Sequence, residues 1–173
     1  YEAATADLRD VNMIDPFHLS AYGVTAVNYN RDVEVFPLVR NILHRITGED
    51  IYKSPTDMGV NMAGNCIIDD EACKEASYME IIRRYYKAAG DVARGKGSEN
   101  EVYKIELLMK QARITTEDRK VTVAANERAE KLGVPAAAIE FADGKIITSK
   151  TTALLGASAA LLLNALKYLG GVD

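Results

Sequence analysis

Apolar positions recur at helical spacing through the middle of the chain. One such stripe predicts a helix from Asp69 or Asp70 to about Ala93. Its members are Cys73, Ala76, Met79, Ile82, Tyr86 and Ala89. A second amphipathic helix is expected around residues 102–112, and a third from Glu117 to Leu132. Residues 69–133 are therefore expected to form a helical block without a strand.

Strand signals lie on either side of this block. Val24–Asn28 is rich in residues that favour strands. Ala137–Phe141 and Lys145–Ser149 flank an Asp-Gly pair, which is a strong signal for a β-hairpin. We expect these segments to share one sheet, so that residues 1–68 and 134–173 form a discontinuous α/β module around the inserted block 69–133. The predicted fold class is helix-rich α+β, with a small sheet of one strand plus a β-hairpin packed with helices.

Helices are also expected in the two end regions. Short ones should run from Pro16 to about Tyr22 and from Asp32 to Ile46, each followed by a glycine that can end it. The last one should begin at Thr151 or Thr152 and reach Leu169. This final helix is apolar on nearly every side, which predicts burial between layers or at a subunit contact.

The segment Tyr52–Asn65 is too polar, and too interrupted by Pro and Gly, for a helix or a core strand. Its mixture of cation, hydroxyls, carboxylate and amides is typical of a loop that contacts a ligand. Gly59 and Gly64 would let backbone N–H groups turn toward one point, as in anion-binding nests. The candidate ligand contacts are Lys53, Ser54, Thr56, Asp57 and Asn61, with Lys53 as the anion contact.

Two further segments carry candidate chemistry. Asp15 and His18 open the first short helix, and His18 is the more interesting of the two histidines because a helix N-terminus favours its neutral form. We predict both as acid–base or polar contacts. Asn28, Asn30 and Arg31 lie at the C-terminal end of a predicted strand, where α/β proteins commonly bind ligands, although turn and cap roles also explain them.

Other patterns favour structural roles. Gly90–Gly97 nearly spells a phosphate-binding loop, but Gly97 stands where Ser or Thr should bind Mg²⁺, and the segment follows a helix rather than a strand. Cys66 and Cys73 are spaced too widely for a usual zinc pair. The acidic run at residues 69–75 could bind Mg²⁺, but acidic residues are common in the first turn of a helix. No metal site is predicted.

Composition narrows the function classes. A net charge of −4 argues against non-specific nucleic-acid binding. The longest apolar run, Ala153–Leu163, is shorter than the ~20 residues that span a bilayer. Two cysteines do not form a secreted disulfide framework, so we expect a cytoplasmic protein. Because the chain begins with Tyr1, we also expect a fragment or a processed product.

Several long strings together resemble the DUF1846 family, also called UPF0371, of uncharacterised bacterial proteins. They are residues 7–18, 27–32, 52–64, 80–86 and 104–109, with further similarity through residues 143–146 and the final helix. The resemblance implies a longer protein, with a Gly-Ser-Gly-Lys loop upstream of Tyr1 and more chain beyond Asp173. It supplies no catalytic residues or cofactor. It also implies a cytidine deaminase-like α/β/α architecture near the C-terminus, although the final helix lacks the residues of deaminase zinc sites.

Two functions stay open on these grounds. The first is the ligand-binding part, with or without catalytic residues, of a cytosolic bacterial enzyme that acts on a phosphorylated or nucleotide-like small molecule. The second is a structural module in which the helical block and the final helix mediate homo-oligomerisation. Convergence of residues 15–18, 28–31 and 53–61 on one place would favour the first.

Overall fold

The computed structural model describes residues 12–58, 62–63 and 68–172. The chain separates into two contiguous compact units, Tyr1–Thr115 (unit 1) and Thr116–Asp173 (unit 2). Each unit contains its own antiparallel sheet and its own helices.

The sheet of unit 1 has the strand order β1-β2-β3. Its strands are β1 (Asn12–Asp15), β2 (Ala26–Tyr29) and β3 (Met62–Ala63). Met13 is opposite Asn28, and Asp15 is opposite Ala26. The short helix α1 (His18–Tyr22) connects β1 to β2 and ends at Gly23, whose φ of 76° suits glycine. This connection places the start of α1 beside the end of β1.

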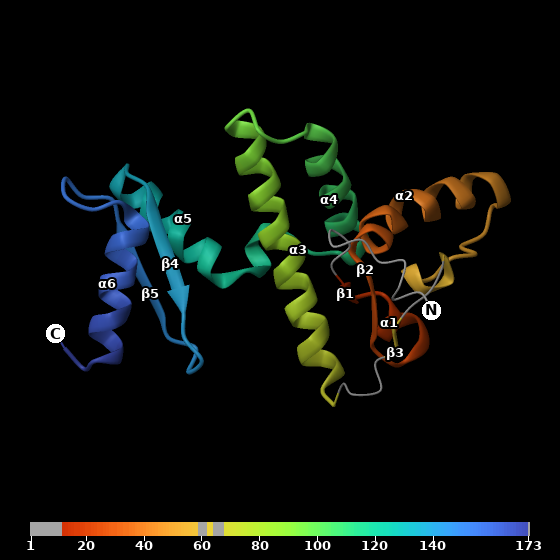
Figure 1. Cartoon of the computed structure of the whole chain (residues 1–173), viewed down its shortest axis with the longest axis horizontal. Coiled ribbons are helices and arrows are strands. Elements are labelled where there is room, and N and C mark those ends of the chain that lie inside the picture. Colours follow the sequence, from red (N-terminus) through yellow and green to blue (C-terminus); the bar gives the residue numbers. More distant parts are fainter. Residues whose placement is uncertain (1–11, 59–61, 64–67, 173) are drawn as a thin grey trace. The chain divides into compact units, whose positions relative to one another are not determined.

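Three longer helices complete unit 1. They are α2 (Asn30–Thr47), α3 (Asp70–Ala93) and α4 (Glu99–Ala112), and α4 lies between α2 and α3 (Figure 1). Their facing apolar side chains form the core, in which Val33, Phe36, Ile81, Ile82 and Leu108 are completely buried. The Ser77 hydroxyl of α3 donates a hydrogen bond to the Ile14 carbonyl and so attaches α3 to β1.

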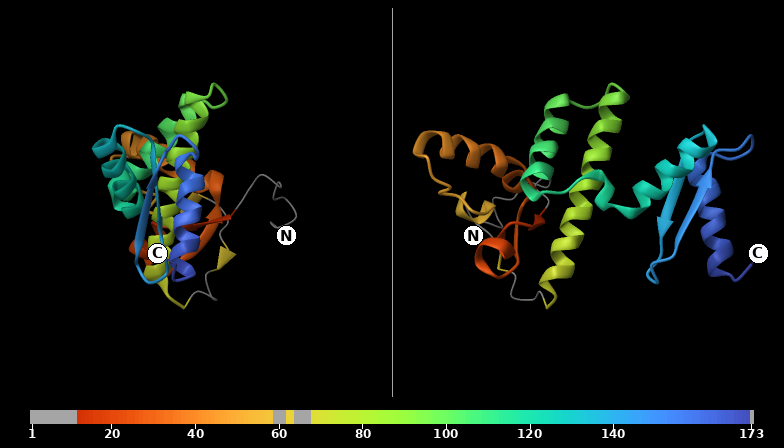
Figure 2. Two further views of the ribbon diagram at one scale, coloured as in Figure 1. Left: turned by 90° about the vertical axis from the view of Figure 1, so that its left-hand side faces the viewer. Right: turned by 180° about the vertical axis from the view of Figure 1, so that it is seen from behind.

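Unit 2 consists of one β-hairpin and two helices. The turn η3 (Thr116–Asp118) leads into α5 (Lys120–Leu132), and the hairpin β4 (Ala136–Glu140) and β5 (Ile146–Lys150) follows. Both α5 and α6 (Ala157–Leu169) pack against the hairpin (Figure 2). The Tyr168 hydroxyl of α6 also donates a hydrogen bond to Asp143 in the hairpin turn.

The structure confirms the helix-rich α+β class and the hairpin, and residues 69–133 contain helices and turns only. The expectation that Val24–Asn28 shares a sheet with the hairpin is wrong, because β2 pairs with β1 and β3. The contiguous units also differ from the predicted grouping of 1–68 with 134–173. The partners of β2 are strands of four and two residues, which are too short to give a strand signal in the sequence. The hairpin strands do give such a signal, so the sequence favoured them as the partners of β2.

The final helix also differs from its prediction. It begins at Ala157 rather than just after Thr151 or Thr152, and Ala165 is its one buried residue within the described structure. Leu162, Leu163, Leu166 and Leu169 are each at least half exposed. Unit 2 alone therefore does not bury this helix.

Candidate functional site

Asp15 organises the junction between β1 and α1. It is the last residue of β1, and its Oδ1 atom accepts hydrogen bonds from the backbone N–H groups of Phe17 (2.8 Å) and His18 (3.2 Å). Those N–H groups lie at the start of a helix and lack partners within it. Asp15 therefore satisfies two N–H groups at the start of α1, and the residue is 1% exposed.

His18 lies one turn further on and faces two hydroxyl groups. Its Nδ1 atom lies 3.0 Å from Thr56 Oγ1 and 3.2 Å from Ser54 Oγ. On the other side its ring packs against Tyr22, with centroids 4.8 Å apart. These contacts fix the imidazole, and the hydroxyls can either donate to Nδ1 or accept from it according to the tautomer.

Asn28 joins the two sides of this network. Its Nδ2 atom donates to Asp15 Oδ2 (3.0 Å) and to Thr56 Oγ1 (3.2 Å). Its Oδ1 atom is buried and has no partner in the part of the chain that the structure describes. A buried acceptor without a donor is costly, which distinguishes this atom from the paired polar atoms around it.

The loop before and within η2 (Pro55–Met58) is held by its own side chains. Asp57 Oδ2 accepts from the N–H groups of Lys53 (2.8 Å) and Ser54 (3.1 Å). Asp57 Oδ1 accepts from the Tyr22 hydroxyl, and Ser54 Oγ accepts from the Thr56 N–H at 3.2 Å. These bonds place Ser54 and Thr56 against His18.

The two carboxyl groups of the site are in opposite environments. Burial raises the pKa of Asp15, although hydrogen bonds from Phe17 and the charge of His18 act against this rise. Burial also acts to raise the pKa of Asp57, but hydrogen bonds from Tyr22 and two N–H groups outweigh it and lower that pKa. The pKa values of the two carboxyl groups are therefore shifted in opposite directions.

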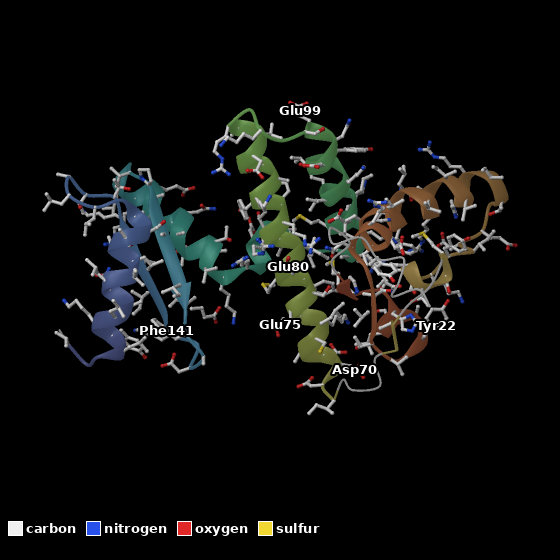
Figure 3. All side chains as sticks on the ribbon, viewed as in Figure 1. Tyr22, Asp70, Glu75, Glu80, Glu99 and Phe141 are labelled. Atoms are coloured by element: carbon white, nitrogen blue, oxygen red, sulfur yellow. The ribbon has the colours of Figure 1, made fainter. Side chains whose placement is uncertain are left out.

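The structure therefore brings together five of the predicted site residues. We call them the polar cluster: Asp15, His18, Asn28, Ser54 and Thr56. Asp57 supports the cluster by fixing the loop. Sequence reasoning missed Tyr22 (labelled in Figure 3), although its position four residues after His18 puts it on the same helix face.

The other candidates lie elsewhere. The Lys53 side chain is exposed, and only its backbone N–H takes part in the recorded bonds of the loop. Asn30 and Arg31, at the start of α2, line a separate cleft with residues of α3 and α4. Asn61 lies outside the described residues.

The alternative motifs have structural roles. Asp69 caps α3 by accepting from the Ala72 N–H (3.0 Å), and Asp70 accepts from the Thr25 N–H (3.1 Å). The segment Gly90–Gly97 ends α3 and turns toward α4, as expected for a motif that follows a helix. In the described part of the chain, no three His, Cys, Asp or Glu side chains form a group suited to a metal ion.

Comparison with known proteins gives the same division as the two units. The N-terminal domain of unknown function DUF1846 matches residues 1–113, and its C-terminal domain matches residues 117–173. The chain belongs to the DUF1846 family. Over all 173 residues of this chain, it is 58% identical to a UPF0371 protein of Streptococcus thermophilus. It is also 56% identical to UPF0371 protein cu0538 of Corynebacterium urealyticum.

This chain spans about a third of its relatives. All 173 residues align with the two proteins just named, but they cover 35% of each one's length. A UPF0371 protein of Streptococcus sanguinis gives the same picture, with 57% identity over 172 residues and 35% coverage. The resemblance noted from the sequence is therefore confirmed.

The helices of the described residues were also compared with what a bilayer requires, and none has the length and apolar character of a membrane span.

Proposed function

We propose that the polar cluster is the ligand-binding and acid–base site of a bacterial enzyme that acts on a phosphorylated or nucleotide-like small molecule. The observation that supports this proposal is the convergence of buried polar side chains from three segments: 15–18, Asn28 and 54–56. Burial of so many polar groups is costly unless they are paired, and here the acceptor Asn28 Oδ1 is buried without a partner among the described residues. A bound ligand would supply the donor.

Each member of the polar cluster has a role in this proposal. His18 is the proton donor or acceptor, because its Nδ1 is held by two hydroxyls while Nε2 has no recorded partner among the described residues. Asp15 fixes the helix turn that carries His18, through the hydrogen bonds that it accepts from the Phe17 and His18 N–H groups. Asn28 orients the ligand through its open oxygen.

The test is a thermal-shift screen of the full-length protein against nucleotides and sugar phosphates. A compound present at 100 times its dissociation constant should add about 2.7 kcal/mol of stability. His18→Asn keeps a polar atom near the Nδ1 position and removes Nε2, so it should abolish most of that shift. His44→Asn is the matched control, because His44 lies exposed on α2 beside Asp50. Equal shifts in both variants, or no shift with any compound, would contradict the proposal.

A second function is favoured by a separate observation, the exposed leucines of α6. In this alternative the chain is a structural module, and α6 mediates self-association. Replacing Leu163 with Lys should then lower the oligomeric state in sedimentation velocity, whereas His18→Asn should not change it. An unchanged oligomeric state in Leu163→Lys would count against this alternative.

A further inference from the structure

A second polar site lies in unit 1, in the cleft where Asn30 and Arg31 are found. The start of α2, the second half of α3 and the first half of α4 line an open cleft of about 570 Å³. This volume falls within the usual range for small-molecule sites, roughly 300–1,000 Å³. Two candidates from the sequence, Asn30 and Arg31, therefore line a cleft, and the residues of the polar cluster are not among its lining.

Positive charge predominates in this cleft. Among the described residues that line it, five are basic: Arg31, Arg83, Arg84, Lys87 and Lys104. Three are acidic: Glu34, Asp91 and Glu101. The lining therefore has a formal charge of +2, and it stays positive when Glu80, which pairs with two of the arginines, is included. The whole chain, by contrast, carries −4.

Carboxylates hold two of the arginines in fixed positions. Glu80, labelled on α3 in Figure 3, accepts from Arg83 Nε (2.7 Å) and from Arg84 Nε (2.9 Å), and Glu34 accepts from Arg84 Nη1 (2.9 Å). Hydrogen bonds from Arg83 are the main cause that lowers the Glu80 pKa to about 2, so Glu80 is ionised at neutral pH. A fixed guanidinium loses less side-chain entropy when it binds a ligand.

These arginines keep donors to spare. A guanidinium carries five N–H donors, and the recorded bonds to Glu34 and Glu80 use two atoms of each. Lys104, on α4, makes no ion pair with any described residue, whereas Lys87 pairs with Asp91 at 3.0 Å. The first turn of α2, which lines the same cleft, adds the positive end of its helix dipole.

We infer that this basic cleft binds the phosphate groups of the ligand. Arginine forks and a helix start suit phosphate oxygens, and several separated cations suit two linked phosphates better than one. The inference rests on the proposed function for one point, that the same ligand reaches the polar cluster. Asn28 of that cluster and Asn30 of the cleft are two residues apart, which is about 7 Å along an extended chain.

Inorganic pyrophosphate is the probe for this site. Isothermal titration of the full-length protein should show that Lys104→Gln weakens pyrophosphate binding at least tenfold. Lys110→Gln is the matched control, since Lys110 is exposed on the same helix but does not line the cleft. Sulfate and citrate should bind more weakly than pyrophosphate, which separates phosphate recognition from general attraction of anions.

The possible outcomes separate this inference from the proposed function. Equal pyrophosphate affinity in Lys104→Gln and Lys110→Gln overturns the phosphate site, as does equal affinity for citrate. His18→Asn should leave pyrophosphate binding unchanged, because His18 does not line the cleft. If His18→Asn also keeps the thermal shift that a nucleotide or sugar phosphate produces in the wild type, the proposed function fails while the phosphate site stands.

Discussion

Unit 1 buries large apolar side chains completely, whereas unit 2 buries mainly small ones. In unit 1, Phe36, Ile81, Ile82 and Leu108 have no exposed surface. In the described part of unit 2, the buried residues are Ser149 and Ala165. Unit 2 keeps its leucines outside instead, with Leu163 50% and Leu166 56% exposed.

This difference shows that the units reach stability by different routes. Unit 1 has enough apolar burial to tolerate a buried polar cluster beside its core, and such tolerance is what a ligand site needs. Unit 2 has a thin core and an apolar surface, and surfaces of that kind usually mark contacts with other protein. The same polypeptide thus combines a region that buries a cluster of polar side chains with a region that exposes apolar ones.

The largest expected effect compares one leucine from each unit. Leu108→Ala should cost 2–5 kcal/mol of unfolding free energy, the usual result for a fully buried leucine. Leu163→Ala should change it by no more than ~0.5 kcal/mol, as for exposed positions. Urea unfolding, with hydrogen exchange to assign the loss to a unit, measures both. Similar costs for the two leucines would remove the contrast between the units.

The next comparison uses one buried serine from each unit. Ser54→Ala should cost about 1–3 kcal/mol, because the Thr56 N–H loses its acceptor and His18 loses a partner. Ser149→Ala should cost about 1 kcal/mol or less, because the carbonyl of Ala157 that it contacts lies in a helix and can accept there. The same urea measurements decide the order, and a larger loss for Ser149 would contradict it.

A smaller effect concerns the pH dependence of unit 1. Because the pKa of Asp15 is raised in the folded state, its contribution to stability is greatest below the ordinary value of 3.8 and is lost as pH rises through the raised pKa. Asp15→Asn removes this loss, because the amide does not ionise. Relative to wild type, the variant should gain stability between pH 3.8 and neutrality. A pH-independent difference would show that Asp15 has an ordinary pKa.

The smallest effect is expected for Lys53→Ala. Its side chain is exposed, and alanine keeps the N–H that donates to Asp57, so the unfolding free energy should change by no more than ~0.5 kcal/mol. A thermal melt beside wild type is sufficient. A clear loss of stability would mean that the ammonium group holds the loop.

Sequence patterns located most elements because helices and hairpins are encoded locally. Three such local signals lie within or next to the element that they predict. They are the apolar stripe on α3, the cap at Asp69 and the Asp-Gly turn of the hairpin. The sheet partners of β2 were missed, because pairing between β2 and β3 depends on residues 35 or more positions apart. The exposure of α6 was missed because its composition is that of a buried helix, and composition does not reveal what covers it.

The sequence identified most of the individual residues of the candidate site, but not which of them lie together. The structure brings together Asp15, His18 and Asn28, which were predicted from their place at an element's end, and Ser54 and Thr56, which were predicted from a polar loop. Arg31 was assigned to the same place as these residues. Arg31 lies instead in the first turn of α2 and lines a cleft with residues of α3 and α4. Which residues line that cleft depends on how the three helices pack.

Pro37, buried inside α2, has a mechanical consequence. Proline has no N–H, so the carbonyl of Val33 lacks its usual donor four residues later. The first turn of α2, with Asn30 and Arg31, is thereby joined to the rest of the helix by fewer hydrogen bonds than an unbroken helix would provide. Packing must therefore hold this turn where hydrogen bonds do not, and the complete burial of Val33 and Phe36 supplies it.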